Sequence, residues 1–436
     1  MWTLLGYLLF FLMVAFPAAP GLTLLKGCLL VVVLISVVVR LLKGQFAPHP
    51  AVAGWTFFFV MLGFLLVLRG LFLATPGAWP MVGVHVLWPI IYFTLLSSIT
   101  TGKRLIGLER VLTLATIFIP IYTFLYLASE TGLLPSLGYV GLSSFREGQG
   151  FGLSDGYIQV STYGLNSMSF LIPFTMATLV TYHTSKEGGR ISRVWSWIGL
   201  FLALGVVLIS GRRALQFVTL LAPLLILGFR SFQPDAEKSL TKTFVVRVVA
   251  VGLCGVIALS LVAGFIYDVK LTRLAEELFG SFDFSATTVS NSANERRSQY
   301  FALLREWHEH PVLGIGLGMP AYGSIRSETM PWAYELSYLA LLCQTGLIGL
   351  LAYAAGIVWI YRTGTRVIKE GAMLGRMILP VLVGMTCFLI ANATNPYLGK
   401  FDGLWAIFLP LAMINYWLVG REAERSYAVR PARGSY

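Results

Sequence analysis

The stretch Leu22–Leu42, LTLLKGCLLVVVLISVVVRLL, decides the fold class, because it is almost wholly apolar over the length of a membrane helix. About 20 apolar residues in a helix cross the roughly 30 Å of hydrocarbon in a bilayer. Similar apolar runs recur along the whole chain. They are Leu4–Phe16, Val52–Leu73, Val82–Ile99, Leu112–Leu127, Leu165–Thr181, Val194–Ile209, Leu215–Phe229, Val245–Ile266, Leu336–Ile360, Met377–Ile390 and Leu404–Leu418. The sequence therefore predicts an all-α polytopic membrane protein with about twelve transmembrane helices.

The composition excludes a water-soluble fold. Of 436 residues, 57% are hydrophobic and 12% are charged, and this charged fraction is about half that of an ordinary soluble domain. The first run, Leu4–Phe16, follows no basic segment and precedes no convincing cleavage site of a signal peptide, so it is interpreted as the first membrane helix.

The net charge of +12 is explained by membrane topology rather than by nucleic-acid binding. If the N-terminus is cytoplasmic, most basic residues between the helices also fall on the cytoplasmic side, as the positive-inside rule requires. These residues are Arg40, Lys43, Lys103, Arg104, Arg110, Lys186, Arg190, Arg193, Arg230, Lys238, Lys242, Arg247, Arg362, Arg366, Lys369, Arg376, Arg421, Arg425, Arg430 and Arg433. Both termini are predicted to be cytoplasmic, and no nucleic-acid partner is expected.

This topology divides the chain into four segments. Residues 1–266 are predicted to hold transmembrane helices 1–9, with an outer loop near 131–164. Residues 267–334 form a large outer loop between helices 9 and 10, residues 335–418 hold helices 10–12, and residues 419–436 are a basic cytoplasmic tail.

An amphipathic helix is predicted within the large outer loop. Ser292 and Glu295 have the S-x-x-E spacing of a capping box, and Pro311 must end the helix. Four apolar residues recur with helical spacing and should lie on the membrane or on the protein, while the arginines of this helix project elsewhere. These apolar residues are Tyr300, Phe301, Leu304 and Trp307.

Arginines on the outer side oppose the positive-inside rule and are the main candidate site residues. Arg212 and Arg213, in the short link Ser210–Arg213, would cost a few kcal/mol if they entered hydrocarbon, so a partner is expected. A ligand anion such as diphosphate suits their planar, permanently charged groups; a lipid phosphate or an outer carboxylate is the alternative. Further arginines that could join them are Arg146, Arg296, Arg297, Arg305 and Arg326.

Other polar or small residues are interpreted as structural. The four cysteines lie singly in apolar runs, with no CxxC or Cys/His pairing, and neither a disulfide framework nor a metal site is predicted. His85 is expected to make an interhelical hydrogen bond. The run Gly314, Gly316 and Gly318 lacks the flanking strands of a nucleotide-binding loop, so it is interpreted as loop geometry.

The ordered set of outer motifs resembles the O-antigen ligase and O-antigen polymerase superfamily of bacterial envelope glycosyltransferases. The motifs are the link Ser210–Arg213, the segment RSQYFALLREW from Arg297, the segment HPVLGIGLG from His310, and a helix that begins near Glu335 and carries QTGLIG from Gln344. Each motif is weak alone, and their order makes the resemblance moderately specific.

The resemblance implies transfer of a glycan from undecaprenyl diphosphate to a sugar hydroxyl at the periplasmic face of a bacterial inner membrane, with no nucleotide sugar, cofactor or metal. Arg212, Arg213, Arg296 and Arg297 would bind the diphosphate and stabilise it as the leaving group, which makes Arg297 a catalytic candidate as well. Arg146 and Arg305 are further candidates for this cluster.

The acceptor hydroxyl also needs a base. Family ligases usually place a His shortly before a Tyr-Leu pair, whereas Glu335 precedes Tyr338-Leu339 here. Glu335 either acts as the base or holds the acceptor or an arginine. Because the His of the family ligases is missing, polymerisation of lipid-linked repeat units is favoured over ligation to lipid A core. A transporter or flippase is less favoured than either enzyme. The expected partners are the lipid-linked donor, a glycan or lipid A-core acceptor and membrane lipids, with a chain-length regulator as a candidate.

Overall fold

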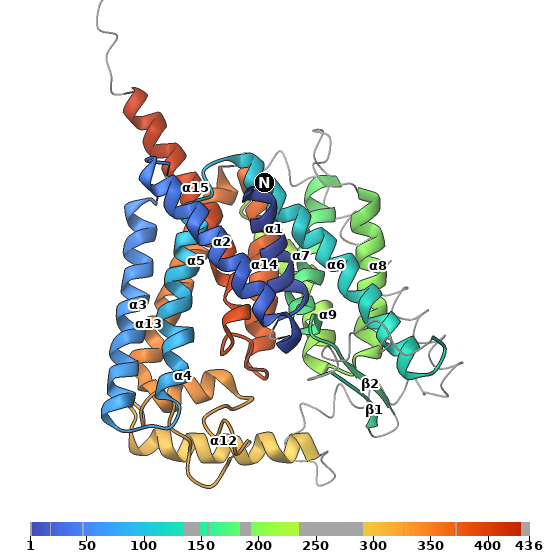
Figure 1. The fold of residues 1–436 in the computed structure, drawn as a ribbon, viewed down its shortest axis with the longest axis vertical. Coiled ribbons are helices and arrows are strands. Elements are labelled where there is room, and N and C mark those ends of the chain that lie inside the picture. The colour runs from blue at the N-terminus through green and yellow to red at the C-terminus, as the bar shows by residue number, and fades with distance from the viewer. Residues whose placement is uncertain are drawn as a thin grey trace, which may run out of the picture.

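The computed structural model describes residues 2–17, 19–45, 48–134, 149–154, 157–183, 193–234, 291–325, 327–370 and 373–428. Most of its helices run along one axis, and helix α12 lies across one end of the bundle (Figure 1). The helices are α1 (Trp2–Ala15), η1 (Pro20–Leu22), α2 (Thr23–Leu42), α3 (Pro50–Phe72), α4 (Ala78–Val82), η2 (Gly83–Leu87), α5 (Trp88–Ser97), α6 (Gly102–Glu130), α7 (Leu165–His183), α8 (Arg193–Ile209), α9 (Arg213–Arg230), α12 (Asn291–Glu309), α13 (Ser337–Lys369), α14 (Met373–Asn392), η6 (Phe401–Gly403) and α15 (Trp405–Ala428).

Seven helical segments of the described chain are long and apolar enough to cross a membrane. They are Pro20–Leu42, Pro50–Phe72, Ala78–Ser97, Gly102–Glu130, Arg213–Arg230, Ser337–Lys369 and Met373–Asn392, and three shorter apolar helices accompany them. These helices confirm the coarse prediction of an all-α membrane protein. The count of twelve spans stays a prediction, and the predicted run Val245–Ile266 lies outside the described residues.

The core of the bundle is formed by α7 and α14, which pack along each other. Phe170 and Phe174 of α7 are fully buried, and Gly384 of α14 lies against Phe170 so closely that an added Cβ would be 2.9 Å from its ring. Small residues at such a contact allow two membrane helices to approach each other.

Helix α15 continues to Ala428, past the expected start of a basic tail at residue 419. The extension has protein partners at the end of α13: the indole of Trp417 donates to Glu370 over 2.6 Å, and Arg421 forms an ion pair with the same carboxylate at 3.0 Å. The predicted tail therefore begins as a helical continuation of α15, and its place on the cytoplasmic side stays a prediction.

A short hairpin lies in the segment predicted as an outer loop near 131–164. Strand β1 (Gly150–Ser154) pairs antiparallel with β2 (Tyr157–Ser161), so that Gly150 lies opposite Ser161. The hairpin lies at the same end of the bundle as α12 (Figure 1), which we call the α12 end.

The predicted amphipathic helix is present as α12, and Pro311 follows its end as expected. Its buried face consists of Gln299, Ala302 and Leu303, with Trp307 packed beside them. Tyr300 and Phe301 are exposed. Leu304 and Trp307 are half-buried, whereas Tyr300 and Phe301 do not pack on the protein, so their contact with the membrane stays a prediction.

The glycine run after α12 is a loop, as predicted. Gly314, Gly316 and Gly318 have φ values of 67°, 114° and 81°, which a residue with a side chain rarely adopts. The amide of Gly77 donates to the carbonyl of Gly318 over 3.0 Å, and Arg69 donates to two carbonyls of the same loop over 2.6 Å each. The loop is therefore fixed against the end of α3.

Candidate functional site at the α12 end

The Ser210–Arg213 link turns the chain between α8 and α9 within a few residues. Gly211 makes the turn possible with a φ of 61°. Arg212 is the N-cap residue of α9 in an extended conformation, and its amide donates to the hydroxyl of buried Ser210 over 3.3 Å. This geometry fixes the backbone from which the Arg212 side chain projects.

The guanidinium group of Arg212 is held by neutral partners. Its Nη2 donates to Oγ of Ser161 over 2.8 Å, and its Nη1 donates to Oδ1 of Asn166. It also forms a hydrogen bond with the hydroxyl of Tyr397, in the segment between α14 and α15. No carboxylate is among the described partners of Arg212, so these contacts orient its positive charge without neutralising it.

Tyr397 does not neutralise this charge either. Burial raises the pKa of its phenol, and the nearby Arg212 lowers that pKa only in part. The phenol therefore stays protonated at physiological pH and acts as a neutral partner.

Arg213 is the first residue of α9 and is half-buried. Its side chain makes no hydrogen bond or ion pair with any residue that the structure describes. The N-terminus of a helix already carries a partial positive charge, so two cations there are unfavourable in the absence of an anion. Among the residues that the structure describes, no carboxylate balances the positive charge of Arg212 and Arg213.

The second pair of predicted site residues lies between α12 and α13. Nε of Arg296 donates to Oε2 of Glu335 over 2.6 Å, and the amide of Glu335 donates to Oε1 of Gln299 over 3.0 Å. Gln299 is fully buried, and its Nε2 has no partner among the described residues. The structure therefore places Glu335 against an arginine, which is one of the two roles expected from the sequence.

The remaining candidate arginines occupy different surroundings. Arg297 is exposed and lies 6.0 Å from the ring centre of Phe301. Arg305 is exposed and donates to the carbonyl of Tyr322 over 2.8 Å, which braces the loop after α12. The other two candidates, Arg146 and Arg326, lie outside the described residues.

The segment between α14 and α15 connects the two groups of site residues. The hydroxyl of Tyr338, one turn after Glu335, donates to the carbonyl of Leu389 at the end of α14 over 2.7 Å. Asn392 accepts the amide of Leu398 over 2.9 Å, which fixes the turn that carries Tyr397. Continuous contacts therefore lead from the Glu335 end of α13 to Arg212.

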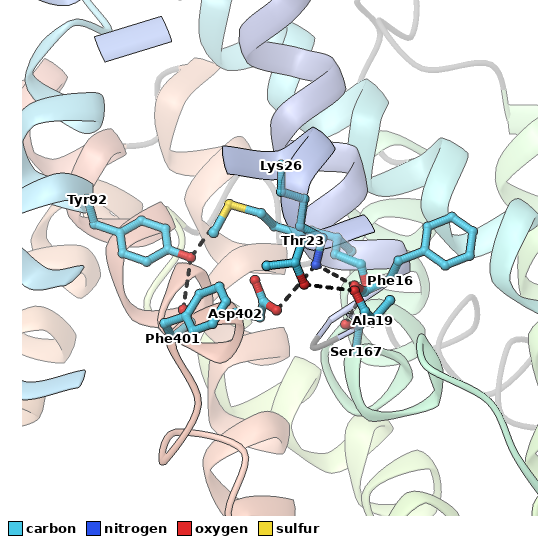
Figure 2. A network of polar contacts seen from close by, with 10 residues as sticks. Phe16, Ala19, Thr23, Lys26, Tyr92, Ser167, Phe401 and Asp402 are labelled. Carbon is cyan, nitrogen blue, oxygen red and sulfur yellow. Dashed lines mark hydrogen bonds and ion pairs between the residues drawn. The ribbon is translucent and has the colours of Figure 1, made fainter. Parts of the chain in front are cut away.

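Asp402, in the same segment, belongs to a buried ion pair with Lys26 that the sequence did not predict (Figure 2). Nζ of Lys26 in α2 lies 3.3 Å from Oδ2 of Asp402 and donates to the carbonyl of Phe16 over 2.6 Å. Tyr92 donates to the carbonyl of the adjacent Phe401 over 3.2 Å. A lysine inside an apolar run is a signal that could have identified this site, because ionisable residues in membrane helices require a partner.

His85 has the structural role that was expected. Its Nδ1 lies 2.6 Å from the hydroxyl of Tyr353 in α13, so it forms an interhelical hydrogen bond. In the described ranges, no three His, Cys, Asp or Glu side chains group together as metal ligands.

No known family model matches the chain, and no curated protein matches its sequence.

Proposed function

We propose that this protein is a membrane glycosyltransferase that polymerises undecaprenyl-diphosphate-linked repeat units, with its site at the α12 end facing the periplasm of a bacterial inner membrane. The observation that carries the proposal is Arg212, a half-buried arginine that neutral side chains orient and that no described carboxylate neutralises. An oriented arginine beside a second arginine at a helix N-terminus suits a diphosphate.

The chemistry follows from the charge that develops in the transition state. The acceptor hydroxyl attacks the anomeric carbon, and the bond to the diphosphate oxygen breaks with its electron pair on the diphosphate. Arg212 stabilises that negative charge without moving, because Ser161 and Asn166 already hold it, and Arg213 adds a second positive charge beside it. The hydroxyl proton goes to a base.

Glu335 is our candidate for that base or for a group that positions the acceptor. Its carboxylate is only partly accessible and lies against Arg296, so an acceptor hydroxyl must approach on the side that Arg296 leaves open. Arg297 adds an exposed positive charge on α12, and Arg296 would share its charge between Glu335 and the diphosphate. Arg305 is a weaker candidate, because it already braces a loop.

Transfer of a finished glycan to lipid A core is the alternative activity, since it uses the same donor. A transporter is the competing class, and charges along a path through the bundle would favour it. Arg212 and Arg213 instead lie together at one end, which supports an enzyme.

The test is the surface-polysaccharide banding pattern of a deletion strain complemented with the wild type, Arg212→Ala, Arg297→Ala or Glu335→Ala. Survival of core that bears one repeat unit, with loss of the long-chain ladder, identifies a polymerase. Loss of all glycan-bearing core, with accumulation of lipid-linked chains, identifies a ligase. An unchanged pattern in the deletion strain would overturn the proposal for that polysaccharide.

A further inference from the structure

A second distinctive region lies at the end of the bundle opposite α12. A partly open cavity of about 140 Å³ is lined by residues of α1, α2, α5, α6 and α15, and these helices lie together in Figure 1. Its walls are apolar side chains such as Met13, Val37, Leu96 and Phe408. Apolar walls favour an apolar occupant, so the apolar part of this cavity suits a short piece of hydrocarbon.

Two arginines line the same cavity. Arg40 stands near the end of α2 and Arg104 at the start of α6. Arg40 makes no side-chain hydrogen bond or ion pair within the described chain. Arg104 donates with its Nη1 to the carbonyl of Ser98, and its other guanidinium nitrogens have no described partner. The two like charges repel each other.

No carboxylate is among the residues that line the cavity. The site thus combines an apolar cavity with two cations whose charge the lining leaves uncompensated. We propose that it binds an anionic phospholipid, with the phosphate between Arg40 and Arg104 and part of one acyl chain in the cavity. Basic pockets between membrane helices bind such headgroups, and each buried CH₂ of a chain adds to the affinity.

This proposal does not depend on the glycosyltransferase activity, since the cavity shares no residue with Arg212, Arg213, Arg296 or Glu335. The two arginines of the cavity also differ from basic residues that only follow the positive-inside rule. Lys103 is adjacent to Arg104 and exposed, and it does not line the cavity. Lys103 therefore provides a matched control for loss of one positive charge at this end of the bundle.

The experiment is native mass spectrometry of the full-length protein in detergent, titrated with dioleoylphosphatidylglycerol or dioleoylphosphatidylcholine. We expect the wild type to retain the anionic lipid more tightly. The double variant Arg40→Gln/Arg104→Gln should weaken that binding about 30-fold, since each basic group near a membrane surface contributes roughly fivefold. Lys103→Gln should change it less than about twofold, because the exposed Lys103 does not line the cavity and exposed charge pairs contribute little.

A second pair of variants tests the acyl-chain part of the proposal. Gly6 lines the cavity, and an added Cβ there meets nothing within 4 Å. Gly6→Phe should fill the cavity and weaken lipid retention with both arginines present. Gly27→Phe, at an exposed position with equally open surroundings, should not. Thermal unfolding of each variant verifies that it is folded.

Three results would overturn the proposal. The first is equal retention of both lipids by the wild type. The second is a loss in Lys103→Gln as large as that in the double variant. The third is displacement of the lipid by glycerol 1-phosphate at equal concentration, which would indicate a site for the phosphate alone.

Discussion

Nε of Arg296 donates to Oε2 of Glu335 over 2.6 Å, and this contact joins the first half of α12 to the start of α13. From the sequence, Arg296 is expected on the diphosphate, and Glu335 is expected either as the base or as a residue that holds the acceptor or an arginine. Gln299 holds the backbone of Glu335 from the same helix. The position of the carboxylate is therefore set by α12 through both its side chain and its main chain.

Substitutions of Arg296 and Glu335 distinguish a chemical role of Glu335 from a structural one. An ion pair that is partly exposed contributes about 0–1 kcal/mol, and a large domain loses roughly 2–4 °C of unfolding temperature per kcal/mol. Arg296→Gln and Glu335→Gln should therefore lower the unfolding temperature by only a few degrees. We expect Glu335→Gln to reduce chain extension at least about 100-fold, the size of a general-base contribution. In vitro transfer from a lipid-linked donor measures this effect. If both variants lose only a little transfer activity, and by the same amount, the role of Glu335 is only to hold Arg296.

Arg212 and Arg213 allow a comparison of two arginines at adjacent positions. Arg212→Lys keeps the charge but removes the planar group that donates to both Ser161 and Asn166. We expect Arg212→Lys to reduce transfer by about 10²-fold, the size found for loss of one oriented donor to developing charge.

Arg213→Lys should reduce transfer less, because no described partner requires a planar group at that position. Both variants should reach the membrane in wild-type amounts, which immunoblotting verifies. Full activity of Arg212→Lys would contradict an oriented, bidentate role for Arg212.

The buried pair of Lys26 and Asp402 gives a prediction for stability. Removal of one member of a buried ion pair costs about 3–5 kcal/mol, whereas replacement of both members by apolar residues is often nearly neutral. Lys26→Met should therefore lower the unfolding temperature markedly, and Lys26→Met/Asp402→Leu should restore most of it. Thermal unfolding in detergent measures both. A double variant less stable than Lys26→Met would show that Asp402 has a separate structural role.

The parts of the fold that depend on local patterns could be predicted from the sequence. Run lengths located the membrane helices, and the S-x-x-E spacing with Pro311 located α12. The candidate arginines were found because the predicted topology puts their charge on the side of the membrane that basic residues usually avoid. These signals all lie within a few residues of the feature that they predict.

The contacts that build the site could not be predicted, because they join distant segments. Lys26 and Asp402 are 376 positions apart, and Arg212 reaches Asn166 across 46 positions. Nothing near Asn166 or Tyr397 in the sequence indicates that an arginine lies against them. The burial of Gln299 on α12 could not be predicted either, because it depends on a contact with Glu335, 36 positions further along the chain.

The glycine loop after α12 provides a last prediction, with a control elsewhere in the chain. Gly318 and Gly44 both have positive φ values, 81° and 65°, so alanine at either position should cost about 1–2 kcal/mol of backbone strain. An added Cβ at Gly44 meets nothing within 4 Å, whereas at Gly318 it would collide with the backbone carbonyl carbon of Gly77.

Backbone atoms of Gly77 cannot move aside as a flexible side chain would, so Gly318→Ala should separate the loop from the start of α4. We expect Gly318→Ala to lower the unfolding temperature clearly more than Gly44→Ala does, and also to lower transfer activity, because this loop lies between α12 and Glu335. Thermal unfolding and transfer assays on the two variants measure both effects. Equal destabilisation by the two substitutions would mean that the contact with Gly77 adds nothing to the strain at Gly318.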